Sequence, residues 1–210
     1  MRIDWIPYSA AALVLGATAL SVGAVLLPSG GDGTAATLEM AQDQSGRWLA
    51  VAVLYFLAGV GLTLGMPSIL TLFKVRGIRF ALTAIGVFTI GCVGVAGFAM
   101  LLAFFSALAK TGEIGAGAID RASSDPRLSV FLLGWIGAFY VGELLLAIAL
   151  LRGGTTRNWI PVMLILHVAL FPVSNFLPDE VQSLTVLLIT VGLAGVGITA
   201  AAERDHPVPA

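Results

Sequence analysis

The residues that could do chemistry in this chain are few, and they lie within long apolar stretches. Glu143, in the segment FYVGELLLAIAL, is the only acid well inside such a stretch, and His167, in VMLILHVALFP, is the only histidine inside one. A charged side chain at the centre of a bilayer costs about 2.5–3.5 kcal/mol on insertion scales. Such a residue must be protonated, paired or in contact with water, so Glu143 and His167 are the first candidates for a functional site.

The spacing of these two residues about a short turn favours a pair. Glu143 lies nine residues before the segment 152–158 and His167 lies nine residues after it. Antiparallel helices with a rise of about 1.5 Å per residue would place both at nearly the same depth. Tyr140 shares the helix face of Glu143. We predict a catalytic or binding cluster of Glu143, His167 and Tyr140; the alternative is a protonated carboxyl bonded to a neighbouring helix and a satisfied core histidine.

A secondary candidate site lies in the segment SNFLPDE, which brings Asn175, Asp179 and Glu180 close together in the sequence. Two carboxyl groups can do acid–base work when their environments separate their pKa values. The competing interpretation is a turn followed by the acidic first turn of a helix, which the helix dipole favours.

Other chemistries lack their motifs. The only cysteine, Cys92, lies inside an apolar stretch, the second histidine, His206, lies in the tail, and no HExxH, CxxC, P-loop or GxSxG pattern occurs. We therefore predict no cofactor and no metal. The net charge of −1 excludes the basic footprint of a nucleic-acid-binding protein.

Composition indicates which elements must position these residues. The 210 residues are 58% hydrophobic and 11% charged, with a mean hydropathy of +0.99, whereas a soluble domain is roughly 45–50% apolar and about 25% charged. Stretches of about 20 apolar residues are long enough to cross a bilayer. We predict an all-α bundle of six transmembrane helices with these spans: 6–27, 49–72, 80–108, 128–151, 159–177 and 181–201.

The distribution of basic residues predicts the orientation. The turn 73–79 carries three basic residues and no acid, and the turn 152–158 carries two and no acid, whereas the turn 178–180 carries two acids and no basic residue. Because short cytoplasmic loops are enriched in lysine and arginine, both termini are expected in the cytoplasm. The longest connections are 28–48 and 109–127, too short for a soluble domain, so residues 1–210 are expected to form a single membrane domain.

Small residues at four-residue spacing predict close helix packing. Gly61 and Gly65 form such a pair, and Gly134, Ala138 and Gly142 form a second stripe. These faces could pack within the chain or against a second copy. The expected partners are membrane lipids, with a homodimer or a membrane complex as further possibilities.

In style the chain resembles the small six-span membrane proteins of high-GC bacteria, through its Ala/Gly/Val/Leu-rich spans, the GRW sequence at 46–48 and the RNW sequence at 157–159. We expect a multi-pass protein of the cell membrane that binds or moves a small apolar or lipid-like molecule, or serves as an accessory subunit. The alternative is an intramembrane enzyme, of lipid or isoprenoid cyclase or isomerase type, with Glu143 as general acid. Whether the chain is an enzyme stays open.

Overall fold

The computed structural model describes residues 4–28, 33–73, 77–176 and 179–202, and the side chains at 174–176 and 179–183 are outside the description. Every regular element in these residues is helical. In chain order the elements are α1 (Ile6–Leu26), α2 (Thr34–Asp43), α3 (Ser45–Leu70), α4 (Ile78–Thr111), α5 (Ala116–Ser123), α6 (Pro126–Gly153), α7 (Trp159–Leu170), the 3₁₀ helix η1 (Phe171–Phe176) and α8 (Asp179–Ala202).

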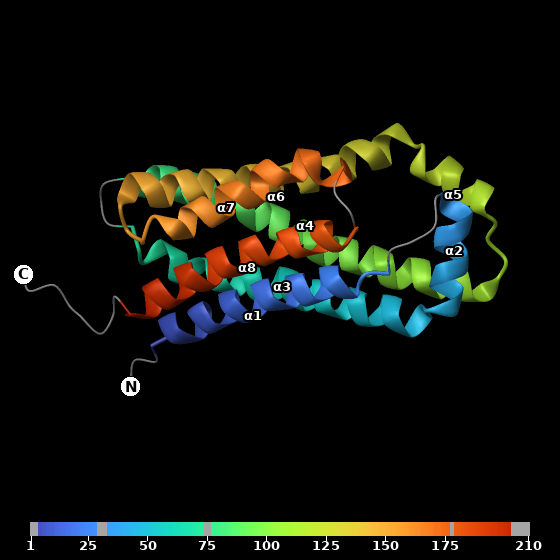
Figure 1. Ribbon diagram of the computed structural model, residues 1–210, viewed down its shortest axis with the longest axis horizontal. Coiled ribbons are helices and arrows are strands. Elements are labelled where there is room, and N and C mark those ends of the chain that lie inside the picture. Colours follow the sequence, from blue (N-terminus) through green and yellow to red (C-terminus); the bar gives the residue numbers. More distant parts are fainter. Residues whose placement is uncertain (1–3, 29–32, 74–76, 177–178, 203–210) are drawn as a thin grey trace, which may run out of the picture.

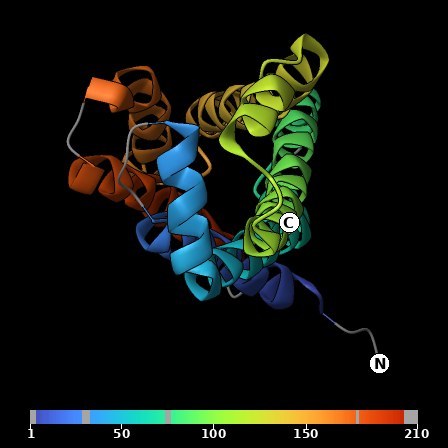
Figure 2. The same ribbon diagram turned by 90° about the vertical axis from the view of Figure 1, so that its right-hand side faces the viewer.

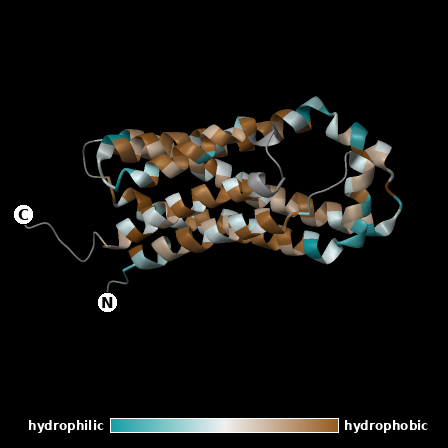
Figure 3. Ribbon diagram, viewed as in Figure 1, coloured by the Kyte–Doolittle hydropathy of each residue, from teal (hydrophilic) through white to brown (hydrophobic). Residues whose placement is uncertain are grey.

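Five of these helices are long and apolar enough to cross a membrane: α1, α3, α4, α6 and the segment Leu184–Ala202 of α8. Apolar residues cover the length of the bundle and polar residues gather at its two ends (Figure 3). The all-helical class that we predicted is confirmed, and the build is that of a multi-pass membrane protein.

The predicted span 159–177 is not one continuous α-helix. The α-helix α7 has 12 residues and ends at Leu170, and the chain continues as η1. Pro172 explains this change, because proline has no N–H to donate to the carbonyl of Val168 and its ring crowds that carbonyl. The chain responds by tightening into a 3₁₀ turn rather than by bending an α-helix.

The long helices form a ring. Each of α1, α3, α4, α6, α7 and α8 packs against the next one along the chain, and α8 packs against α1 (Figures 1 and 2). The start of α1 and the end of α8 lie at one end of the ring, which we call the terminal end (Figure 1). The short helices α2 and α5 belong to the two longer connections, 28–48 and 109–127, and lie together at the opposite end (Figure 1).

Glycines allow the closest approaches within the ring. A Cβ atom on Gly61 of α3 would lie 2.9 Å from the Cα atom of Gly16 of α1, and one on Gly65 would lie 2.7 Å from the Cα atom of Leu13. The pair Gly61 and Gly65 thus packs within the chain. In the second predicted stripe Gly142 packs closely, whereas a Cβ atom on Gly134 would meet open space.

A hydroxyl group from α1 bridges an interruption in the backbone hydrogen bonds of α3 beside its internal proline. The Ser9 hydroxyl donates to the carbonyl of Leu64 at 2.8 Å and accepts from the N–H of Ser68 at 3.1 Å. It is therefore inserted between two backbone groups that an uninterrupted helix would join directly. Ser9 lets α3 pass through Pro67 without leaving the buried N–H of Ser68 or the carbonyl of Leu64 unpaired.

We expect Ser9→Ala to lower the free energy of unfolding by about 2 kcal/mol, because the buried N–H of Ser68 and the carbonyl of Leu64 lose their partner. Thermal unfolding followed by circular dichroism in detergent micelles would measure this loss. Thr18→Ala is the matched control on α1, because the exposed Thr18 hydroxyl bonds only to the carbonyl of Val14 in its own helix. Equal stability of the two variants would contradict the bridging role of Ser9.

Candidate functional site

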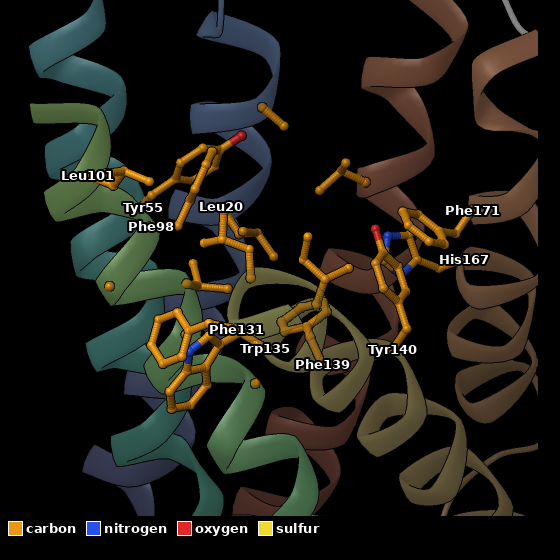
Figure 4. A pocket seen from close by; sticks show the side chains of 18 of the residues that line it. Leu20, Tyr55, Phe98, Leu101, Phe131, Trp135, Phe139, Tyr140, His167 and Phe171 are labelled. Atoms are coloured by element: carbon orange, nitrogen blue, oxygen red, sulfur yellow. The ribbon is translucent and has the colours of Figure 1, made fainter. Parts of the chain in front are cut away.

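A cavity of about 620 Å³ lies inside the helical ring (Figure 4). Residues of all six ring helices and of η1 line it, and the lining side chains that the structure describes include no Asp, Glu, Lys or Arg. Its walls are largely aromatic and aliphatic, with contributions from Leu20, Phe98, Phe131, Trp135, Phe139 and Phe171. Cavities of this size and character are typical binding sites for small molecules.

The ring is open at the level of this cavity because the first half of α6 diverges from the core. None of residues 126–138 is buried, whereas Phe139, Gly142, Glu143 and Leu146 are. Gly91 of α4 marks the point at which the two helices close together, since its Cα faces the backbone of Phe139. The cavity therefore lies beyond this crossing, on the side of α2 and α5, and side chains fill the ring toward the terminal end.

Glu143 and His167 meet at the inner edge of the cavity. The Nδ1 atom of His167 lies 2.9 Å from both carboxyl oxygens of Glu143. Glu143 is completely buried and His167 is 5% exposed. The antiparallel packing of α6 and α7 that the sequence predicted brings these side chains together, with Gly154 ending α6 in the left-handed conformation at φ 58°. Their functional role stays a prediction.

The two side chains have different access to the cavity. His167 lines it and Glu143 does not, because Glu143 lies behind the imidazole ring. A carboxylate behind a histidine fixes the orientation of the ring and determines which nitrogen faces outward. Nδ1 is held by Glu143, so Nε2 is the nitrogen that a bound molecule would meet.

Tyr140 completes the predicted cluster. It lies one turn before Glu143 on α6, and its ring stacks on that of His167 with 5.6 Å between centroids and on that of Phe171 with 3.9 Å. These three rings lie together on one side of the cavity, with Tyr55, Phe98 and Leu101 on the other (Figure 4). The structure thus brings Glu143, His167 and Tyr140 into one cluster.

Four residues with polar side-chain atoms line an otherwise apolar cavity: His167, Tyr140, Tyr55 and Trp135. Nε2 of His167, the two tyrosine hydroxyls and Nε1 of Trp135 have no hydrogen-bond partner within the described part of the chain. Trp135 lies deep in the predicted span 128–151, where an indole N–H needs a partner, and it lines the cavity. Tyr55 was missed, although a phenol hydroxyl within an apolar segment is a comparable signal.

The secondary candidates Asn175, Asp179 and Glu180 lie on η1 and at the start of α8, and their side chains fall outside the described residues. Cys92 is fully buried and does not line the cavity. Among the described residues, no three His, Cys, Asp or Glu side chains lie close enough together to hold a metal ion.

Comparison with models of protein families, with curated proteins and with solved structures finds no match for this chain.

Proposed function

We propose that this chain binds or moves a small apolar or lipid-like molecule in the cavity inside its helical ring. The observation that carries the proposal is the cavity itself, which combines about 620 Å³ of volume with apolar walls and a few polar side chains, His167 and Tyr140 among them. Such a site buries the body of a ligand in apolar surroundings and orients it through a few polar groups.

The proposal includes a topology in which all six ring helices cross the cell membrane and both termini lie in the cytoplasm. The five long helices supply five crossings. The sixth would combine α7, about 18 Å long, with η1, about 12 Å long, which together match the ~30 Å of the hydrocarbon core. The arginine-containing turn 154–158 lies at the terminal end of the ring (Figure 1), and the positive-inside rule favours the cytoplasm for that end.

Exposed apolar side chains on α6 favour membrane lipids as partners of the helical ring. Val130, Phe131 and Leu133 are 71%, 59% and 64% exposed, and they belong to the half of α6 that diverges from the core. Acyl chains would cover these side chains in a bilayer. In an accessory subunit, or in a homodimer, a neighbouring protein would cover the same face.

Filling the cavity should weaken binding. Ala24 lines the cavity from α1, so the ring of Ala24→Phe would occupy ligand volume. We expect binding of small apolar molecules to weaken about tenfold to a hundredfold, corresponding to the cost of overpacking. The measurement is native mass spectrometry of the gently purified protein, which counts retained lipids and added tridecane.

Ala11→Phe is the matched control, because Ala11 lies exposed on the same helix and outside the cavity lining. It should bind as the unaltered protein does. If Ala24→Phe retains its ligands as well as Ala11→Phe, the cavity is not the binding site.

A second candidate function, an intramembrane enzyme, is favoured by one observation. The hydrogen-bonded Glu143 and His167 form a proton-sharing pair, and His167 touches the cavity. In that arrangement His167 would exchange a proton with the bound molecule and Glu143 would supply or accept a proton at Nδ1. Recovery of a co-purified molecule in chemically altered form after incubation would support the enzyme, and recovery of unaltered molecules would support the binding protein.

A further inference from the structure

The geometry of the Glu143–His167 pair limits where its protons can be. Both oxygens of Glu143 lie 2.9 Å from Nδ1 of His167, and the described part of the chain offers this carboxyl group no other hydrogen-bond partner. A proton must therefore lie between the carboxyl group and Nδ1, on one side or on the other. The remaining question is whether Nε2, the nitrogen toward the cavity, also carries a proton.

Electrical neutrality answers this question. With a proton on Nε2, the pair has no net charge, whether it is a carboxyl with a neutral imidazole or a carboxylate with an imidazolium. Without that proton, the pair carries one negative charge. An uncompensated charge inside a bilayer costs several kcal/mol, and Glu143 is completely buried. The neutral pair is favoured, and its Nε2–H group points toward the cavity as a hydrogen-bond donor.

The other polar groups of the cavity can also donate hydrogen bonds. The indole N–H of Trp135 can only donate, and the hydroxyls of Tyr140 and Tyr55 can donate. Among the side chains that the structure describes, none that lines the cavity is cationic or anionic. A charged ligand would lose its hydration there without gaining a counter-ion, whereas a neutral ligand with an acceptor oxygen would satisfy the free donors.

We propose that the cavity takes a neutral lipid-like carbonyl compound, such as a ketone, a quinone or an ester, and that Nε2–H of His167 donates to its carbonyl oxygen. The inference rests on the proposed function and names its ligand class. A carbonyl oxygen has two lone pairs, so it can also accept from the hydroxyl of Tyr140, whose ring stacks on that of His167. The carbonyl group has no hydrogen-bond donor that would need an acceptor in the cavity.

The test compares three probes of matched chain length: methyl undecyl ketone, tridecane and tridecanoate. Each is added to the purified full-length protein at the same mole fraction in the micelle, and bound probe is counted by native mass spectrometry. We expect the ketone to bind about tenfold more tightly than tridecane, the fold-change that corresponds to one hydrogen bond, and tridecanoate to bind most weakly. Infrared spectroscopy should show a lowered C=O stretching frequency for the bound ketone.

Two variants assign the preference to the pair. The double replacement Glu143→Leu with His167→Leu removes the donor without leaving a buried charge, and it should bind ketone and tridecane equally and lose the infrared shift. Glu143→Gln should keep the preference, because its amide N–H can donate to Nδ1 and leave the proton on Nε2.

The outcomes separate this inference from the proposed function. If tridecane binds but the ketone shows no advantage, or if the advantage persists in the double variant, the inference is wrong and the binding function stands. Tighter binding of tridecanoate would also overturn the inference. If no probe binds the unaltered protein, the proposed function fails and the inference fails with it.

Discussion

Replacing His167 with leucine should lower the free energy of unfolding by about 3–5 kcal/mol, the cost of removing one partner from a buried ionisable pair. His167 supplies the 2.9 Å contacts of the Glu143 carboxyl group. Glu143 is completely buried and does not line the cavity. After the replacement its carboxyl group has no hydrogen-bond partner in the described part of the chain, and leucine cannot supply one.

The measurement is thermal or denaturant unfolding in detergent micelles, followed by circular dichroism. The control is the double variant in which leucine replaces both Glu143 and His167, which should regain most of the lost stability, since apolar residues of similar volume can replace a buried pair at little cost. If His167→Leu alone is as stable as the unaltered protein, the pair is not what compensates for the burial of Glu143. If the double variant is no more stable than His167→Leu, packing of the imidazole ring explains the loss instead.

The second large effect is expected where α4 crosses α6. A Cβ atom on Gly91 would lie 2.3 Å from the Cα atom of Phe139, and one on Gly142 would lie 2.4 Å from the Cα atom of Phe88. Each glycine thus faces the backbone of the other helix beside an aromatic ring, and the two rings pack at 5.1 Å between centroids. Backbone atoms cannot move aside as a flexible side chain can.

Gly91→Val should therefore destabilise the protein by about 3 kcal/mol, at the upper end of the usual cost of overpacking. It should also weaken ligand binding, because Gly91 and Phe139 line the inner part of the cavity. Unfolding in micelles and native mass spectrometry measure the two effects. Gly86→Val is the matched control on α4, since a Cβ atom there meets nothing within 4 Å. Similar stability of both variants would contradict the close crossing.

Much of the fold could be predicted from the sequence because a bilayer imposes a simple rule. A helix that crosses the membrane must be apolar over about 20 residues, and five of the six predicted spans correspond to long apolar helices in the structure. The exception, at 159–177, shows the limit of the rule. A hydropathy profile holds no information about the N–H group that Pro172 lacks, so it did not predict the change from α7 to η1.

The candidate site was predicted in part for a similar reason. Glu143 and His167 stand out because ionisable residues are rare in apolar segments, and the symmetric spacing about one short turn placed them at the same depth. The sequence did not determine how each helix is rotated about its own axis, and a different rotation of α6 or α7 would have separated the two side chains. The structure brings them to 2.9 Å, and it places Glu143, the predicted general acid, behind His167 rather than in the cavity wall.

By itself the sequence determined that this chain is an apolar helical protein with one conspicuous acid and one conspicuous histidine. Those properties depend on composition and on local spacing, which can be read along the chain. Only the tertiary structure decided that the helices form a ring, that the first half of α6 diverges to leave a cavity, and that His167 rather than Glu143 lines it. The physical reason is that a cavity and its lining depend on the rotation and crossing of helices, which glycine contacts between distant segments set.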